Sequence, residues 1–193
     1  MHILNDITNF LIATIGSWGY VGIFLLMFLE SSFFPFPSEV VMVPAGYLSY
    51  TGQMNLALVL FFGISGSLSG AWFNYLLASQ FGRKLLYKIT SSQKVEKLDT
   101  FFEKHGHIST FTGRLIPGVR QYISFPAGLA KMNPIKFSIY TILGAGIWVS
   151  LLVMLGYFLG QNQALIHKYL KEITIAMLIF VTILIFGYIR FKK

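Results

Sequence analysis

The sequence predicts an all-α polytopic membrane protein, built as an inverted repeat with two proline-broken, re-entrant helical hairpins. Of 193 residues, 55% are hydrophobic, 17% aromatic and only 11% charged, which is too apolar for a soluble domain of this length. Residues 40–82, 137–167 and 173–189 carry no charged side chain. Two proline-containing segments also resemble each other. Together these observations favour a single integral membrane domain over residues 1–193.

The N-terminal region is expected to form an amphipathic helix over residues 3–15, lying near the membrane interface. The Gly16-Ser17-Trp18-Gly19 stretch is expected to interrupt this helix. Residues 20–29 are strongly apolar but too short to cross alone, since a crossing needs about 20 residues. The start of the chain has neither a basic segment nor a small-residue cleavage site, so no removable signal peptide is expected.

About three full membrane crossings are predicted. The first two are 55–81 and 137–160, and 173–189 is a third, near the lower length limit. Asn133 followed by Pro134 is typical of an N-cap with proline at the first helical position. Two glycine pairs with a spacing of four residues permit either a homodimer contact or packing within one chain: Gly66/Gly70 and Gly156/Gly160.

Residues 83–108 form the one extended polar stretch, and an apolar stripe at helical spacing predicts a surface helix that ends at His105-Gly106. With this loop and the C-terminus in the cytoplasm, eleven of the fifteen basic residues lie on that side, as the positive-inside rule favours. Topology therefore explains the net charge of +8, and no nucleic-acid binding is expected. The small chain with short loops indicates a bacterial plasma (inner) membrane.

An internal repeat joins the two proline segments. A shift of 82 residues places Pro35 on Pro117 and Pro44 on Pro126, and both copies end in Pro-Ala-Gly. The residues expected to shape the hairpins, about 28–50 and 109–132, are these: Pro35, Pro37, Pro44, Gly46, Pro117, Pro126 and Gly128. Chance similarity of two apolar stretches is the alternative. Each copy precedes a crossing with a tryptophan, for which packing or lipid contact is expected: Trp72 and Trp148.

The charges differ between the two copies. The first carries Glu30 and Glu39, and the second carries Arg114 and Arg120. Proline-interrupted segments in corresponding halves of a membrane protein indicate a transporter with its site near the midplane, and ionisable groups at that depth mark functional sites. The hairpins are therefore expected to enter from opposite faces and to meet tip to tip.

The sequence resembles the DedA family, also called the SNARE-associated or VTT-domain family, over roughly residues 18–160. The motifs that carry the resemblance are Phe28-Leu29-Glu30, Pro35-x-Pro37-x-Glu39, Ala45-Gly46, Gly113-Arg114-Leu115-Ile116-Pro117-Gly118-Val119-Arg120 and Ala127-Gly128. The resemblance implies a lipid transporter (flippase or scramblase) of the inner membrane. Undecaprenyl phosphate and phosphatidylethanolamine are the substrates it suggests, with coupling to protons or sodium. It also implies functional acids at Glu30 and Glu39 and functional arginines at Arg114 and Arg120.

The residues themselves agree with this chemistry. Arginine stays protonated and can grip a phosphate with two parallel donors, so Arg114 and Arg120 are candidate substrate-binding residues. Ser38 is expected to cap the half-helix that begins near Glu39, and it is a third substrate-binding candidate. Glu30 and Glu39 could carry the coupling ion, because a carboxylate that alternates between a dry site and an arginine partner binds and releases a proton.

Other functions stay open on the sequence alone. The four charges could form a structural ion-pair network, or the protein could be a proton/cation antiporter in which the arginines are structural. A lipid-phosphate enzyme is disfavoured, because the hairpins contain no His or Cys nucleophile. No metal or cofactor is expected, since no His/Asp/Glu cluster has ligand spacing. A scaffold for other membrane machinery would leave the intramembrane charges unexplained.

Overall fold

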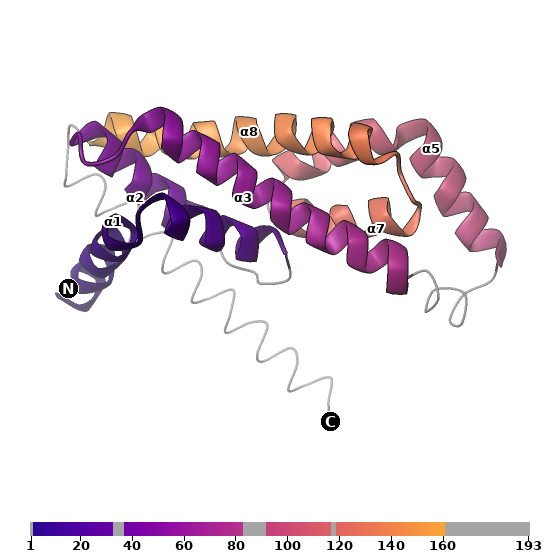
Figure 1. Cartoon of the computed structure of the whole chain (residues 1–193), viewed down its shortest axis with the longest axis horizontal. Coiled ribbons are helices and arrows are strands. Elements are labelled where there is room, and N and C mark those ends of the chain that lie inside the picture. The colour runs from indigo at the N-terminus through magenta and orange to yellow at the C-terminus, as the bar shows by residue number, and fades with distance from the viewer. Residues whose placement is uncertain (1, 33–36, 83–91, 117–118, 161–193) are drawn as a thin grey trace, which may run out of the picture.

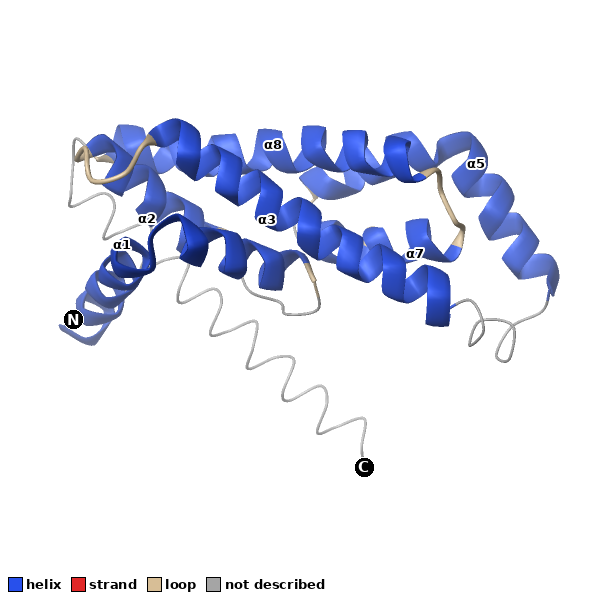
Figure 2. Ribbon diagram, in the orientation of Figure 1, coloured by secondary structure: helices blue, strands red, loops and turns tan. Residues whose placement is uncertain are grey.

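The computed structural model describes residues 2–32, 37–82, 92–116 and 119–160, and each regular element in these ranges is a helix (Figures 1 and 2). The elements are α1 (His2–Ser31), α2 (Glu39–Tyr50), α3 (Leu56–Leu77), the π-helix η1 (Ala78–Gly82), α5 (Ser92–Leu115), α6 (Val119–Tyr122), α7 (Ser124–Leu129) and α8 (Pro134–Leu159). The predicted all-α class is confirmed. Four sequence predictions concern residues outside the described ranges: Pro35, Pro117, the crossing 173–189 and the C-terminus.

Three of the described helical stretches are long and apolar enough to cross a membrane: Ala13–Ser31, Leu56–Gly82 and Pro134–Leu159. The last two confirm predicted crossings. The first corrects the expectation for residues 20–29, because the apolar helical stretch extends back to Ala13 and gains the length that 20–29 lacks. The predicted interruption is confined to Gly19, whose φ of 60° and ψ of −149° are open to a residue without a Cβ.

Both long helices of the centre begin at asparagine caps. Asn133 Oδ1 accepts hydrogen bonds from the amides of Ile135 (3.0 Å) and Lys136 (3.1 Å), and Pro134 occupies the first turn, as predicted. Asn55 caps α3 in the same way, accepting from the amides two and three residues ahead at 2.9 and 3.2 Å. These caps satisfy amide donors that a helix start leaves without partners.

Helix α5 differs from its prediction, because it continues through His105-Gly106 to Leu115 instead of stopping. Gly106 is buried, and a Cβ there would lie 3.1 Å from Phe102 Cδ1 and 3.3 Å from Met132 Sδ. The glycine therefore serves a close approach to the turn after α7 and does not terminate the helix. One continuous helix carries the polar segment and the first arm of the second hairpin.

The two halves of the chain exchange their return arms (Figure 1). In the first half, α1 lies along α3 while α2 turns back and packs on α8 of the second half. In the second half, α5 lies along α8 while α7 packs on α3 of the first half. Each long helix therefore contacts one arm of its own half and one of the other half.

Glycines make each of these four contacts close. A Cβ at Gly66 of α3 would lie 2.5 Å from the Phe24 carbonyl oxygen, and one at Gly144 of α8 would lie 3.1 Å from that of Phe111. The arms of the hairpins carry the other contacts: Gly46 faces the Val153 carbonyl, Gly156 faces the Val43 carbonyl, and Gly128 faces the Tyr75 carbonyl. The predicted glycine pairs therefore pack inside one chain, since Gly70 also faces α1 and Gly160 faces Tyr50. They supply no surface for the expected homodimer.

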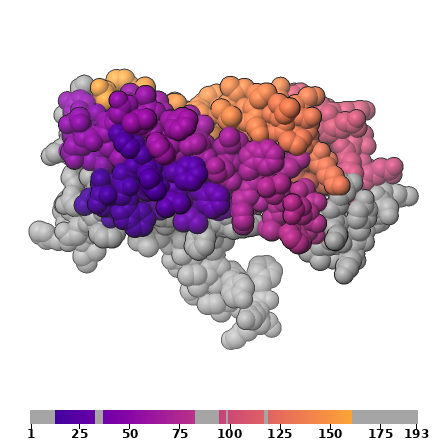
Figure 3. Space-filling model, viewed as in Figure 1, coloured from indigo at the N-terminus to yellow at the C-terminus, as the bar shows by residue number. Residues whose placement is uncertain are grey.

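Two apolar clusters fill the interior of the described chain. One joins α1, α2, the start of α3 and the end of α8, and the other joins α3, α5, α7 and the start of α8. Between them, α3 and α8 carry small and polar buried residues, among them Ser67, Gly70 and Gly144. On the outside, α1, α3 and α8 lie side by side (Figure 3), and Phe61 and Phe158 are about two-thirds exposed, as suits a lipid-facing surface.

Candidate functional site

The ends of three helices bring opposite charges together between the two clusters. Arg120 of α6 places its Nη2 atom 3.0 Å from Oε1 of Glu30, near the end of α1, and 3.7 Å from Oε1 of Glu39, the first residue of α2. The side chains of Arg120 and Glu30 are 9% and 3% exposed, and that of Glu39 is 20% exposed. Three of the four predicted charged residues thus meet where the two hairpins touch.

The ion pair leaves much of the guanidinium unused. Nε and Nη1 of Arg120 are buried without a hydrogen-bond partner, and Glu30 Oε1 lies near Nη2 without forming a well-aligned hydrogen bond. Arginine offers five N–H donors in a planar fork, which suits a second, bidentate anion. Leaving buried donors unpaired is costly, so a partner with acceptor oxygens would be stabilised here. The arrangement can hold an anion in addition to the glutamates, or in their place.

Glu30 is oriented by its neighbour. Ser31 Oγ donates a hydrogen bond of 2.8 Å to Glu30 Oε2, while the other carboxylate oxygen faces Arg120. Ser32 closes the end of α1 by donating its hydroxyl hydrogen to the Leu29 carbonyl at 2.8 Å. Two short polar side chains at the tip therefore fix the carboxylate without adding charge.

Arg114, the fourth predicted charge, has different surroundings. It lies in the last turn of α5, is 3% exposed, and donates from Nη2 to Ser124 Oγ of α7 at 2.7 Å. Its aliphatic stem packs on α8, where a Cβ at Gly144 would lie 2.6 Å from Arg114 Cβ. Nε is buried without a partner. Arg114 thus connects the two arms of its own hairpin, whereas Arg120 connects the two hairpins.

Ser38 does not have the predicted role. It precedes α2, but its φ of −60° and ψ of −21° are already helical and its side chain caps no amide. Its carbonyl begins the helix instead, accepting from the Met42 amide at 2.8 Å. The hydroxyl oxygen accepts a hydrogen bond of 3.1 Å from the indole Nε1–H of Trp148. The capping prediction is wrong because an N-cap side chain reaches its amides from an extended backbone.

Sequence reasoning missed two residues of this region. Trp148 of α8 lies against Arg120, with the guanidinium carbon 5.0 Å from the ring centroid, although packing or lipid contact was expected. Asn74 of α3 is 2% exposed and bridges the hairpins, because its Nδ2 lies 2.8 Å from the Ser32 carbonyl oxygen and 3.3 Å from that of Gln121. The available signal was a polar or amphipathic residue within an uncharged crossing.

The hairpin-shaping residues act in two ways. Pro44 does not break the chain as predicted, since α2 continues from Glu39 to Tyr50 through it. Pro126 accompanies a real break: it cannot donate to the carbonyl of Tyr122, where α6 ends before α7 begins at Ser124. Gly46 and Gly128 serve the close helix contacts described above, and Pro37 immediately precedes Ser38 in the connection to α2.

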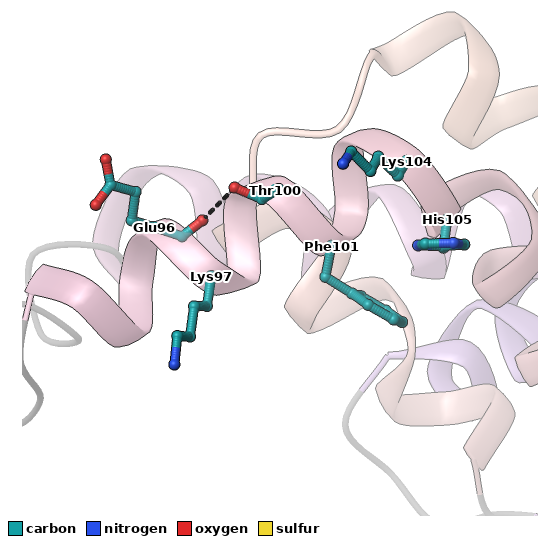
Figure 4. A pocket seen from close by; sticks show the side chains of 6 residues that line it. All are labelled: Glu96, Lys97, Thr100, Phe101, Lys104 and His105. Atoms are coloured by element: carbon teal, nitrogen blue, oxygen red, sulfur yellow. Dashed lines mark hydrogen bonds between the residues drawn. The ribbon is translucent and has the colours of Figure 1, made fainter.

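The described residues contain one further hollow worth comparing with this site. A depression of about 550 Å³ lies along α5 and is lined by Glu96, Lys97, Thr100, Phe101, Lys104 and His105 (Figure 4). In the figure, Lys97 and Lys104 extend in different directions and Phe101 lies flat between the turns. The hollow contains none of the predicted site residues. Within the described ranges, no group of three or more His, Cys, Asp or Glu side chains could hold a metal ion.

Comparison with known proteins identifies the family. The VTT domain model matches residues 36–158, which is more than half of the chain. The chain belongs to the VTT-domain family. This confirms the resemblance to the DedA family, and the matched range contains Glu39, Arg114 and Arg120, with Glu30 just before it.

Relatives of this VTT-domain protein extend over most of its length. It is 35% identical to uncharacterized membrane protein YkoX of Bacillus subtilis, over 92% of this chain and 80% of the relative. It is 32% identical to protein DedA of Escherichia coli K12 (78% and 73%). It is 30% identical to undecaprenyl phosphate transporter A of Bacillus subtilis (95% and 95%). No solved structure gives a significant match.

Proposed function

We propose that this protein is a flippase or scramblase that moves a lipid with a phosphate-containing headgroup between the leaflets of a bacterial plasma membrane. The observation that carries the proposal is Arg120: a buried guanidinium shared by two glutamates, with two N–H groups that have no partner. A lipid phosphate that crosses the hydrocarbon region needs its charge compensated there, and arginine supplies a permanent charge with bidentate geometry.

The substrate class follows from this chemistry and from one relative's name. Undecaprenyl phosphate is the first candidate, because a relative of nearly equal length is named undecaprenyl phosphate transporter A. Phosphatidylethanolamine is the second candidate, since its phosphate offers the same acceptor oxygens. We assign Arg120 to the phosphate directly. Arg114, with one buried Nε–H unused, and Ser38 complete the proposed substrate-binding set.

The membrane arrangement is part of the proposal. The segments around 28–50 and 109–132 act as re-entrant hairpins from opposite faces. Support comes from the matching contacts of the two halves: Gly46 on Val153 repeats as Gly128 on Tyr75, after the same shift of 82 residues that relates the prolines. Non-helical backbone at membrane depth is tolerated where protein covers it. Residues 83–108 and the C-terminus are assigned to the cytoplasm by the positive-inside rule.

Ion coupling is assigned to the two carboxylates, with protons or sodium as the driving ion. Glu30 is nearly enclosed and Glu39 is one-fifth exposed, so both share Arg120 while only Glu39 has appreciable access to the outside. When a phosphate takes the guanidinium, each carboxylate loses its counter-charge and is stabilised by binding a cation. Substrate entry and ion uptake are thereby linked.

A second candidate, a proton/cation antiporter, is favoured by the same pair of carboxylates facing one arginine. In that case the ions would move without any lipid, and Arg120 would balance charge only. Arg120→Lys separates the two: bidentate phosphate binding suffers, while simple charge balance survives.

The deciding experiment is lipid translocation in proteoliposomes, with undecaprenyl phosphate and phosphatidylethanolamine tested side by side, with and without a pH gradient. Movement of one lipid that is lost in Arg120→Ala and Glu39→Gln supports a coupled transporter and names its substrate. Dissipation of the pH gradient without lipid movement contradicts the lipid assignment and favours the antiporter. Phosphate released from either lipid would point instead to an enzyme.

A further inference from the structure

Trp148 touches both hairpin tips although it belongs to neither. We propose that Trp148 is a positioning residue: it holds the guanidinium of Arg120 in place while that group exchanges its glutamate partners for the substrate phosphate, and it thereby sets substrate affinity. This inference rests on the proposed function and adds a residue of α8 to the site.

The ring supports the arginine from the side. Arg120 Cζ lies 5.0 Å from the centroid of the Trp148 ring, within the range of about 6 Å in which a cation is attracted to an indole face. Arg120 is 8% exposed, and this attraction strengthens when water is excluded. Tryptophan is the aromatic side chain with the strongest attraction of this kind.

The ring itself is held by the first hairpin. Its Nε1–H donates to Ser38 Oγ at 3.1 Å, and Ser38 is fully buried beside Glu39. The indole edge thus binds the tip that carries the acids, while the indole face contacts the arginine of the other tip. One rigid side chain from α8 fixes the relative position of the two.

The contact with the ring and the contacts with anions use different parts of the guanidinium. Carboxylates and phosphates bind the N–H groups, which lie in the guanidinium plane, and the ring is approached by the central carbon. Glu30, Glu39 and a phosphate therefore compete for the N–H edge, whereas Trp148 keeps its contact throughout. Because the arginine need not be repositioned when the partner changes, less side-chain entropy is lost on substrate binding.

The chain offers a matched control in Trp72. Its Nε1–H donates to Ser138 Oγ at 3.0 Å, the same type of hydrogen bond on the equivalent kind of helix. Its ring packs on Tyr75 and Phe137, with centroid distances of 5.2 and 5.9 Å. Trp72 thus shares the packing and the hydrogen bond of Trp148 but has aromatic rings where Trp148 has Arg120.

The test is the concentration dependence of undecaprenyl phosphate translocation in proteoliposomes. Trp148→Leu is expected to raise KM about tenfold with less than a threefold change in kcat, as removal of a cation–π contact predicts. Trp148→Phe keeps an aromatic face and is expected to restore KM to within about threefold, and Trp72→Leu to change KM by less than threefold. A lower kcat with unchanged KM in Trp148→Leu, or an equal KM effect in Trp72→Leu, would overturn the proposal.

A double-mutant cycle with Arg120→Lys gives the second readout. Lysine lacks the planar guanidinium, so Trp148→Leu should change KM less than twofold in that background, whereas fully additive effects contradict a direct contact. If the wild-type protein moves no lipid, the proposed function fails, and the same cycle is measured on thermal unfolding of the purified protein. Non-additive unfolding shifts would then retain Trp148 as the support of Arg120, and additive shifts would remove it.

Discussion

The two hairpin tips have related sequences but different structures. The first tip returns into one continuous helix, α2, which passes through Pro44, whereas the second returns through two short helices, α6 and α7, with a break at Ile123. The break puts Arg120 on a separate four-residue turn that faces the acids of the first tip. A shared proline pattern therefore sets where a hairpin turns, while the contacts around it decide whether its arm stays straight.

The tips also differ in how their charges are satisfied. The glutamates of the first tip depend on the other hairpin for their counter-charge, but Arg114 of the second tip has Ser124 of its own hairpin as a partner. Arg120 is the one predicted site residue that joins both tips through charge. We expect the strongest effects of mutation at this junction and weaker effects within either tip.

The largest effect is expected from Arg120→Ala. It leaves Glu30, 3% exposed, without its counter-charge, and removal of one partner of a buried ion pair costs about 3–5 kcal/mol. The free energy of unfolding in detergent measures this loss. Arg120→Ala/Glu30→Gln should recover most of the stability, while Lys136→Ala, at an exposed position, should cost less than about 0.5 kcal/mol. A double variant as unstable as Arg120→Ala would mean that the ion pair is not the cause.

The exchanged return arms predict an intermediate effect that is equal in both halves. A Cβ added at Gly46 or Gly128 would meet the carbonyl oxygen of Val153 or Tyr75, and such overpacking costs about 1–3 kcal/mol. Gly146→Ala is the control, since its Cβ would meet only Ile64 Cδ1 at 3.8 Å. Unfolding free energies within about 1 kcal/mol of each other for Gly46→Ala and Gly128→Ala would support equivalent halves. A large loss from one of them alone would mean that the halves are held differently.

The smallest effects concern the two serines that distinguish the tips. Ser124→Ala removes a hydrogen bond from a charged, buried guanidinium, with an expected cost of about 1.5–3 kcal/mol. Ser38→Ala removes the acceptor of a neutral indole N–H, with an expected cost of about 1 kcal/mol. Thermal unfolding of both single variants checks the order. A Ser38→Ala variant that is less stable than Ser124→Ala would contradict the assignment of these bonds.

Several features of the site lie beyond what the sequence could predict, for identifiable reasons. Both tryptophans occupy similar apolar contexts, and only the position of α6 against α8 makes Trp148 a neighbour of Arg120. Gly106 looks like a helix stop until Met132, 26 residues later, is seen to pack against it. The capping prediction for Ser38 failed because Trp148, 110 residues away, provides the partner of its hydroxyl.

By itself, the sequence determined the helical membrane class, the repeated proline segments and the acids and arginines that make up the candidate site. These depend on composition, uncharged length and residue spacing, which act locally along the chain. Tertiary structure decided that Arg120 meets both glutamates while Arg114 binds Ser124, and that Asn74 and Trp148 join the two tips. These pairings depend on how the return arms pack across the two halves, and no local spacing encodes that arrangement.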